Sequence, residues 1–329
     1  MSLEEVRQVS DFKDRFLDKY FPVLDYGFVA LKDCMGNDQS IVQMARCSYG
    51  AGTKAISTDR GLIRTLMREK HTSPFERCEL VIHVGLPIFV ARQWVRHRTA
   101  NLNEYSGRYS VMPMIFYTPE EQQCLTQNKT NRQGRGHDLA YPHGSYGGFV
   151  YDTEMLRQTM QDNYKMRLDR DLARELARID LPLSMYTYWY WKCDLHNLLH
   201  FLRLRLDPHA QWEIRAYANV IAGLVKEWCP LAWEAFEDYV LGGVSFSRLE
   251  QAVIFDILRN GGGFTADVSQ VEKLATEQGL SKREITQLID KLKFKPQLSN
   301  YTLDLSTAKE PAYFEQLIAD NSKLEVVPT

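Results

Sequence analysis

The stretch from residue 80 to residue 109 constrains the fold more than any other part of this sequence. Residues 80–84 (Leu-Val-Ile-His-Val) are rich in β-branched side chains and predict a strand. Pro87 then opens a helical pattern with apolar residues on one side, namely Ile88, Ala91, Trp94 and Val95. A strand that passes directly into a helix indicates a protein that mixes both kinds of element.

Three longer helices are predicted farther along the chain. Residues 150–178 show the charged, Leu- and Met-spaced pattern of an amphipathic helix, and residues 209–227 look helical up to Cys229 and Pro230. Residues 195–206 place five leucines at positions i, i+3, i+4, i+7 and i+11, which is one helical face. Residues 118–148 are predicted as a loop, and loops of that length are usually functional or mobile.

Two adjacent glycines at 242 and 243 suggest a domain boundary. We expect a helical N-terminal extension over residues 1–22, a main domain over 23–243 and a small helical appendage over 244–329. Residues 268–278 and 281–293 of the appendage could form a helix-turn-helix, but residues 245–329 carry 10 basic and 12 acidic side chains. The resulting net charge of −2 lacks the positive potential that DNA binding needs, which favours a packing or oligomerisation role.

The overall composition excludes several classes of protein. Forty Lys and Arg against 42 Asp and Glu argue against a main role in binding nucleic acid. The longest apolar run, residues 80–91, is interrupted and shorter than the roughly 20 residues that a membrane span needs. The N-terminus lacks the apolar core of a secretory signal. The six cysteines form no CxxC pair, which favours free thiols, no structural zinc and a cytoplasmic protein.

The residues best suited to chemistry concentrate between positions 92 and 109. The sequence has neither G-x-G-x-x-G nor G-x-x-x-x-G-K-[ST], so side chains must hold any bound phosphate. Guanidinium groups grip phosphate through paired N–H donors, and four lie here: Arg92, Arg96, Arg98 and Arg108. A solvated, salt-bridged helix end is the plainer alternative, but it would carry Lys and Glu rather than Arg, His, Asn and Ser beside Trp94.

Arg96-His97-Arg98, followed after seven residues by Ser106, resembles the RHR-x7-S signature of flavin-dependent thymidylate synthases. Further segments resemble that family in the same order along the chain: residues 71–76, Ala177-Arg178 before Leu181-Pro182, residues 203–205 and residues 209–213. Several separated motifs in order are far more specific than one. The resemblance covers roughly residues 24–240.

This resemblance implies an α/β (α+β) fold with an antiparallel-rich sheet flanked by helices. It implies a methyltransferase that converts dUMP to dTMP, using methylenetetrahydrofolate and NADPH through FAD, in a homotetramer whose sites lie where subunits meet. The implied FAD contacts are Ser73, Arg96, His97, Arg98, Glu104, Asp194, His196 and His200. The implied dUMP contacts are Gln93, Arg96, Glu104, Ser106, Gly107, Arg108, Arg178 and Arg205.

The residues themselves give a physical reason for this chemistry. No cysteine precedes a histidine, as it does in thymidylate synthases that attack uracil C6 with a thiol. Activation then comes from polarising the ring, and we assign this role to Arg205, whose fixed charge stabilises an enolate-like anion. Arg203 lies roughly 200° around the same helix and points elsewhere. An ordinary charged helix residue is the alternative for Arg205.

Other interpretations stay open. Ser106 could be a nucleophile, but no base lies near it in the sequence, so a hydrogen bond to phosphate is favoured. Residues 73–76 also fit a helix capping box. His196 and His200 have the spacing of zinc ligands without the Glu of a metalloprotease helix, and no metal is predicted. The rival functions are a nucleotide- or RNA-binding protein without catalysis and a metal-dependent hydrolase.

Overall fold

The computed structural model describes residues 3–47, 59–129, 134–259, 268–293 and 301–322. The chain divides into two compact units, one of residues 1–233 with 301–329 and one of residues 234–300. This division differs from the predicted appendage over 244–329, because the end of the chain returns to the first unit. The predicted extension over 1–22 also belongs to the first unit.

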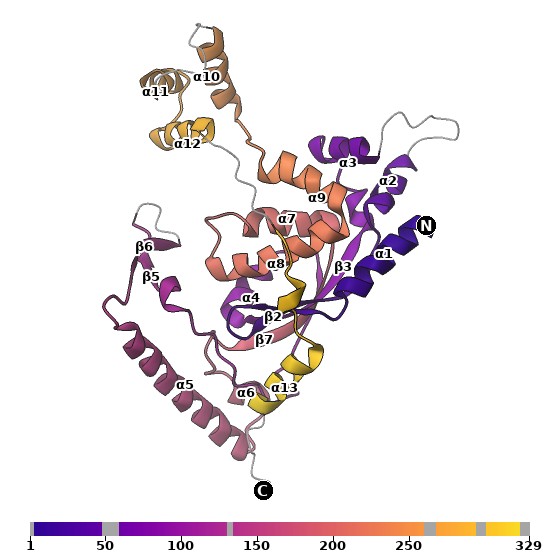
Figure 1. Ribbon diagram of the computed structural model, residues 1–329. Coiled ribbons are helices and arrows are strands. Elements are labelled where there is room, and N and C mark those ends of the chain that lie inside the picture. The colour runs from indigo at the N-terminus through magenta and orange to yellow at the C-terminus, as the bar shows by residue number, and fades with distance from the viewer. Residues whose placement is uncertain (1–2, 48–58, 130–133, 260–267, 294–300, 323–329) are drawn as a thin grey trace. The chain divides into compact units, whose positions relative to one another are not determined.

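A five-stranded antiparallel sheet forms the centre of the first unit, in the order β1-β2-β3-β7-β4, so the predicted α/β class with an antiparallel sheet is confirmed (Figure 1). The strands are β1 (Tyr20–Val23), β2 (Gly27–Met35), β3 (Glu79–Pro87), β4 (Asn101–Glu104) and β7 (Tyr186–Asp194). The strand predicted over 80–84 is β3, in the middle of the sheet. It carries Gly85 where a Cβ atom would lie 2.7 Å from the ring of Phe28, so only glycine fits there.

Three helices pack on one face of the sheet: α4 (Ile88–Trp94), α7 (Leu195–Arg205) and α8 (Trp212–Trp228). Trp189 and Trp191, two residues apart on β7, share that face because side chains alternate along a strand. Their rings lie 5.7 and 5.4 Å from the ring of Trp94. Phe201 of α7 and Tyr217 of α8 close the cluster at 4.8 and 6.0 Å from Trp94. The leucine spacing and the helical pattern before Pro230 thus predicted α7 and α8 correctly.

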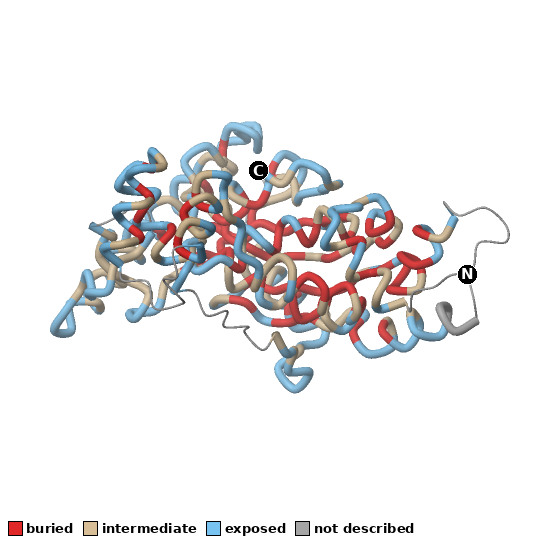
Figure 2. The backbone as a smooth tube through the Cα atoms, turned by 90° about the horizontal axis from the view of Figure 1, so that it is seen from above, coloured by how far each residue is buried: buried red, intermediate tan, exposed pale blue. Residues whose placement is uncertain are grey.

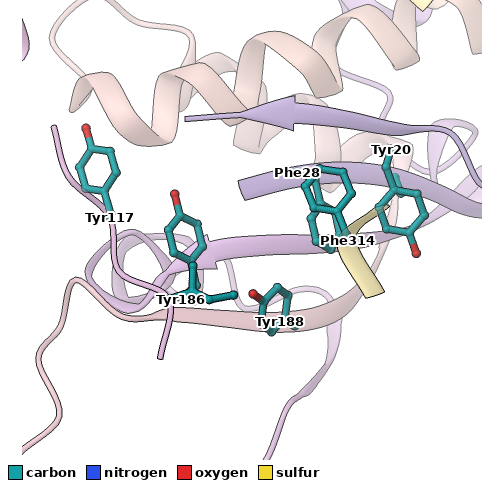
Figure 3. Close-up of a cluster of buried hydrophobic side chains, with 8 residues drawn as sticks. Tyr20, Phe28, Tyr117, Tyr186, Tyr188 and Phe314 are labelled. Carbon is teal, nitrogen blue, oxygen red and sulfur yellow. The ribbon is translucent and has the colours of Figure 1, made fainter. Parts of the chain in front are cut away.

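The opposite face of the sheet is covered by α13 (Pro311–Ser322), near the end of the chain (Figure 3). Phe314 packs against Phe28 at 4.6 Å and stacks on Tyr20 at 5.6 Å between ring centroids. Tyr188 of β7 belongs to the same buried cluster. The aromatic surface of the sheet therefore draws residues 301–322 back onto the first unit after the chain has left it.

The remaining elements complete the structure, and the buried residues are shown in red in Figure 2. They are α1 (Leu3–Phe16), α2 (Asp38–Arg46), α3 (Asp59–Arg68), η1 (Phe75–Arg77), η2 (Glu121–Gln123), β5 (Leu125–Gln127), β6 (Arg135–Leu139), α5 (Tyr146–Asp169), α6 (Arg174–Ala177), α9 (Pro230–Phe236), η3 (Glu237–Leu241) and η4 (Leu305–Thr307). Among the described helices, none combines the length and apolar character that crossing a bilayer requires.

Three local expectations were wrong. The helix predicted over 150–178 is broken between α5 and α6, where Asp171 has a φ of 56° that ends a right-handed helix. The loop predicted over 118–148 contains the hairpin β5–β6, whose short polar strands give little sequence signal. The capping box at 73–76 does not form, because η1 is a single turn whose N-cap is Pro74.

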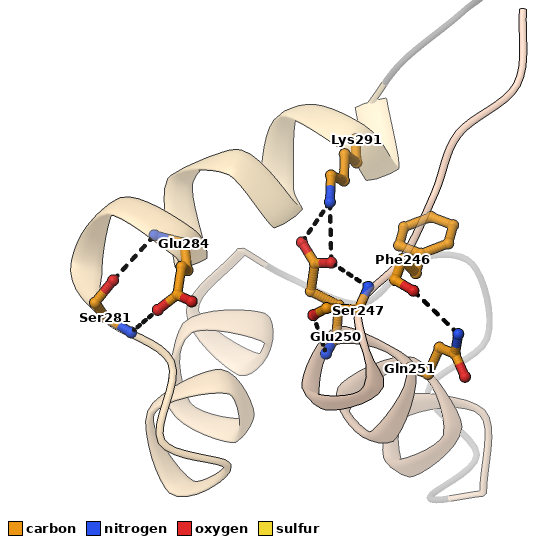
Figure 4. A network of polar contacts seen from close by, with 7 residues as sticks. All are labelled: Phe246, Ser247, Glu250, Gln251, Ser281, Glu284 and Lys291. Atoms are coloured by element: carbon orange, nitrogen blue, oxygen red, sulfur yellow. Dashed lines mark hydrogen bonds and ion pairs between the residues drawn. The ribbon is translucent and has the colours of Figure 1, made fainter. Parts of the chain in front are cut away.

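In the described part of the second unit, a small apolar core lies between α10 (Arg248–Arg259), α11 (Val268–Glu277) and α12 (Lys282–Lys293). Capping boxes begin α10 and α12, with Ser247 paired to Glu250 and Ser281 to Glu284 (Figure 4). Lys291 reaches both carboxylate oxygens of Glu250, at 2.7 and 2.9 Å, and ties α12 to α10. The helices predicted over 268–278 and 281–293 are confirmed.

Candidate active site

Five of the predicted site residues line two pockets of the first unit, three in one pocket and two in the other, and these pockets share no residue. The β4 pocket has a volume of about 510 Å³, and its walls include Glu104, Tyr105, Ser106, Met112, Glu175 and Arg178. The α4–α7 pocket has a volume of about 430 Å³, and its walls include Gln93, Gly134, Arg135, Arg205, His209 and Gln211. Within one chain, therefore, the structure does not gather the predicted residues into a single site.

The β4 pocket is built on the edge strand of the sheet. Glu104, the last residue of β4, is exposed, and its Oε1 accepts a hydrogen bond of 2.7 Å from Thr187 Oγ1 on β7. Gly107 is buried just beyond the strand, and a Cβ there would lie 2.5 Å from Met112 Sδ and 3.0 Å from Arg178 Cδ. Glycine thus lets the turn pack directly against Arg178.

Ser106 lines the same pocket, and Arg108 contacts Glu175 of its wall. The Ser106 Oγ accepts a 3.3 Å hydrogen bond from the backbone N–H of Arg108, and no base of the described residues contacts the hydroxyl. The Arg108 guanidinium pairs with Glu175 at 3.2 Å, and both side chains are 55% exposed. A pair this exposed contributes little to stability, so its arginine is available to an anion at low cost.

The α4–α7 pocket centres on Arg205, in the last turn of α7. Its Nε donates to His97 Nε2 at 3.1 Å and its Nη2 to the Gln93 carbonyl at 3.4 Å. Burial, the Arg205 charge and His200 lower the pKa of His97 to about 4. His97 is therefore neutral at pH 7, with Nε2 as an acceptor that orients the guanidinium. Arg203, two residues earlier, is exposed, as predicted.

A chain of hydrogen bonds that the sequence did not reveal runs from this pocket into the core. Gln93 Nε2 donates to Gln211 Oε1, and Gln211 Nε2 donates to Glu213 Oε2 at 2.8 Å. Glu213 is 1% exposed, pairs with Arg135 of β6 and accepts a 3.1 Å hydrogen bond from Tyr117. The sequence signal was present, since Gln211 and Glu213 lie in the segment 209–213 that resembles the family.

Comparison with known proteins identifies the family. Residues 30–231 match the family model described as "Thymidylate synthase complementing protein", which is well over half of the chain. The chain belongs to the flavin-dependent thymidylate synthase family. This family consists of enzymes, so the predicted family and enzyme class are confirmed, and nothing supports the alternative of a non-catalytic nucleotide- or RNA-binding protein.

Relatives named "Flavin-dependent thymidylate synthase" match most of the chain. The protein from Ehrlichia ruminantium (strain Gardel) is 49% identical over 84% of this chain and 89% of its own length. The protein from Treponema denticola is 46% identical over 84% of this chain and 98% of its own length. A solved UMP/dUMP methylase from Streptomyces cacaoi, bound with 5-Br dUMP, is 31% identical with a TM-score of 0.59, covering 66% of this chain and 97% of its own.

Several residues predicted to bind the flavin of this family lie just after α4 or on α7. Arg96 and Arg98 are exposed directly after α4, and neither makes an ion pair with any described residue. His200 of α7 is exposed, and its ring centroid lies 6.0 Å from that of His97. Unpaired guanidinium groups beside an aromatic surface fit the diphosphate and ring of a flavin nucleotide.

The other predicted flavin contacts have separate surroundings. Both carboxylate oxygens of Asp194 cap α7 by accepting from the backbone and side-chain N–H groups of Asn197, at 2.9 and 2.8 Å. Ser73 is exposed before η1, which packs against α7, and His196 is half-buried. In the part of the chain that the structure describes, no three His, Cys, Asp or Glu side chains cluster as a metal site would require.

Proposed function

We propose that this chain converts dUMP to dTMP, taking a one-carbon unit from 5,10-methylenetetrahydrofolate and reducing equivalents from NADPH, with FAD as its cofactor. Relatives that are 48–49% identical over 84% of this chain carry the name of that enzyme. A structural neighbour holds a bromine-substituted dUMP. The single observation that carries the proposal is Arg205, a half-buried guanidinium oriented by a neutral histidine in a pocket.

Arg205 activates the pyrimidine in this proposal. Its fixed positive charge stabilises the negative charge that develops on the uracil ring when C5 acts as a nucleophile, as an oxyanion hole stabilises its anion. The chain offers no thiol for the alternative attack on C6, since no cysteine lines either pocket. Burial raises the pKa of Cys34 to about 12 and that of Cys193 still further, so both stay protonated.

FAD supplies the redox chemistry when it is bound. Arg96 and Arg98 would hold its phosphates, while Ser73, His97, Glu104, Asp194, His196 and His200 would surround the rest of the cofactor. This assignment places the flavin next to Arg205 through His97, which contacts the guanidinium directly. The free cysteines of the described chain suit the cytoplasm, where we place the enzyme.

The active site is completed by a second subunit in this proposal. Gln93 and Arg205 of one subunit bind the base, and Arg96 contacts both dUMP and the flavin. Glu104, Ser106, Gly107, Arg108 and Arg178 of a neighbour bind the sugar and phosphate, and Glu104 also contacts the flavin. Gln93 and Arg205 line one pocket of the chain whereas Glu104, Ser106 and Arg178 line the other, and this separation supports the arrangement. Ile179 in the wall of the β4 pocket is 66% exposed, as expected for a surface that a partner covers. We propose a homotetramer.

Tritium release tests the proposed function. The FAD-loaded protein should release tritium from dUMP labelled at C5, and release should require both NADPH and methylenetetrahydrofolate. Omitting either co-substrate, or removing FAD, is the control. A protein that binds no flavin, or that releases no tritium with all components present, would overturn the proposal, and so would a covalent thioether to any cysteine during turnover.

A further inference from the structure

We infer that Glu213 is a positioning residue that sets which end of the Gln93 amide faces the α4–α7 pocket, and thereby selects uracil over cytosine nucleotides. This inference rests on the proposed function, because it concerns the base that Gln93 and Arg205 bind. Glu213 itself lies in the core, 1% exposed, and does not line the pocket. It acts only through Gln211.

The carboxylate of Glu213 fixes the direction of the hydrogen bonds that lead to the pocket. A carboxylate accepts hydrogen bonds and donates none. Arg135 and Tyr117 donate to its Oε1, and Gln211 donates to its Oε2 at 2.8 Å. Gln211 must therefore direct its amide nitrogen, Nε2, at Glu213, because its amide oxygen could not bond to a carboxylate.

The orientation of the Gln211 amide in turn fixes the orientation of the Gln93 amide. With its nitrogen directed at Glu213, Gln211 offers only its oxygen, Oε1, to Gln93. Gln93 must donate through Nε2, and its own Oε1 makes no hydrogen bond with the described residues. Gln93 lines the pocket, and its amide is thus locked with Nε2 used as a donor and Oε1 left as the acceptor for a ligand.

The locked amide complements one pyrimidine and opposes the other. Uracil offers a donor, N3–H, between two acceptor oxygens, whereas cytosine offers an acceptor at N3 and a donor at N4. An acceptor from Gln93 beside the donors of Arg205 matches the uracil edge. Cytosine would place a lone pair against Gln93 Oε1 and an amino group against the guanidinium, leaving buried polar groups unpaired.

Arg135 and Tyr117 hold the carboxylate in place. We call the hydrogen-bonded chain Gln93–Gln211–Glu213 the relay. Arg135 of β6 pairs with Glu213, at the buried end of this relay, and also donates to Gln123 at 3.0 Å. Burial and the adjacent Glu213 charge raise the pKa of Tyr117, so its hydroxyl remains a donor. Both oxygens of Glu213 thus accept hydrogen bonds, so every hydrogen bond of the relay donates toward Glu213.

The Glu213→Gln variant tests the inference, because it can reverse the relay without changing its shape. The new amide would keep its oxygen toward Arg135 and Tyr117 and turn its nitrogen toward Gln211. Gln211 and Gln93 would then both flip, and Gln93 would present a donor. Calorimetric titration of the FAD-loaded variant should show dUMP affinity reduced about tenfold or more, and the preference for dUMP over dCMP reduced by a similar factor.

A second variant keeps the test decisive if loss of the ion pair to Arg135 prevents folding. Gln211→Leu removes the relay but leaves Glu213 paired, so Gln93 can turn either end to the pocket and the preference for dUMP over dCMP should again fall. Tyr117→Phe, which removes a donor without changing the relay direction, should keep the wild-type preference. An unchanged ratio in folded Glu213→Gln or Gln211→Leu would overturn the inference.

The wild-type titration separates the two proposals. Binding of dUMP to the wild type with an unchanged ratio in the variants refutes the role of Glu213 alone. A wild-type FAD-loaded protein that binds neither dUMP nor dCMP refutes the proposed function and this inference together.

Discussion

The α4–α7 pocket and the β4 pocket are organised in opposite ways. In the first, Arg205 bonds to His97 and Gln93, and Gln93 leads through Gln211 to a buried carboxylate. In the second, Arg108 forms an exposed pair with Glu175 of the pocket wall and lies over the ring of Tyr109, and an edge strand supports the wall. Under the proposed function, the chain preorganises the pocket that would polarise the base, whereas the pocket that would bind phosphate needs its ligand and a neighbouring subunit to become ordered.

Removal of Arg205 should have the largest effect. Arg205→Ala should slow methyl transfer by about 10³-fold or more, because the charge that stabilises the transition state is lost. FAD binding should persist, since Arg96 and Arg98 remain. Tritium release and flavin absorbance measure the two effects. Arg203→Ala, an exposed neighbour on the same helix, is the matched control and should stay within about twofold of the wild type.

Filling the space at Gly107 should disturb the β4 pocket next most. In Gly107→Ala the new Cβ would meet Met112 Sδ at 2.5 Å and push Arg178, so dUMP affinity should fall about tenfold. Gly147→Ala is the matched control, because nothing lies within 4 Å of its added Cβ. Titration of both variants with dUMP measures the difference in affinity. Equal affinity in the two would mean that the turn at Gly107 does not shape the site.

Loss of Arg108 should weaken nucleotide binding without stopping the chemistry. Arg108→Ala should raise the KM for dUMP about five- to tenfold and leave kcat within about twofold, because the arginine binds phosphate in ground and transition states alike. Glu175→Gln removes the same surface pair without the phosphate contact and should leave KM near the wild-type value. A kcat defect that exceeds the KM defect in Arg108→Ala would place this residue in the chemical step instead.

The smallest effect concerns pH. Burial first, and then nearby positive charge, lowers the pKa of both His83 and His97 from 6.5 to about 4. Between these values the unfolded chain binds protons that the folded chain does not, so each histidine makes the protein lose stability as the pH falls from about 6.5 to 4.

The two histidines can be compared by variants. His97→Gln and His83→Gln should each reduce the loss of unfolding free energy between pH 7 and pH 5, relative to the wild type. Urea unfolding at the two pH values measures the change. If both variants lose as much stability on acidification as the wild type, neither imidazole is held neutral by the fold.

The sequence predicted the parts of the fold that depend on local patterns. The leucines of 195–206 repeat on one helical face, and the β-branched run at 80–84 needs no distant partner to be recognised as a strand. The packing of Phe314 on Tyr20 and Phe28 could not be predicted, because it joins opposite ends of the chain through an unpatterned aromatic contact. For the same reason, the predicted appendage over 244–329 does not match the second unit, which spans residues 234–300.

The candidate site likewise has parts that the sequence predicted and parts that it could not predict. Residue type and spacing indicated the arginine-rich segment as a candidate site, and the family resemblance indicated Arg205. The relay was not, because Gln93 and Gln211 are 118 residues apart, and Arg135 and Glu213 are 78 apart. Polar pairs at such separations leave no periodic signal. The division of five predicted residues between two pockets also required coordinates, since sequence order does not tell which side of the sheet a loop reaches.

Subunit complementation tests most directly the claim that each active site combines the two pockets from different chains. Arg205→Ala and the double variant Ser106→Ala/Arg178→Ala should each be inactive alone. After the two are mixed under conditions that exchange subunits, random pairing should give about a quarter of the sites intact halves, with tritium release recovering to about a quarter of the wild-type rate. Mixed oligomers that form but stay inactive would contradict the account.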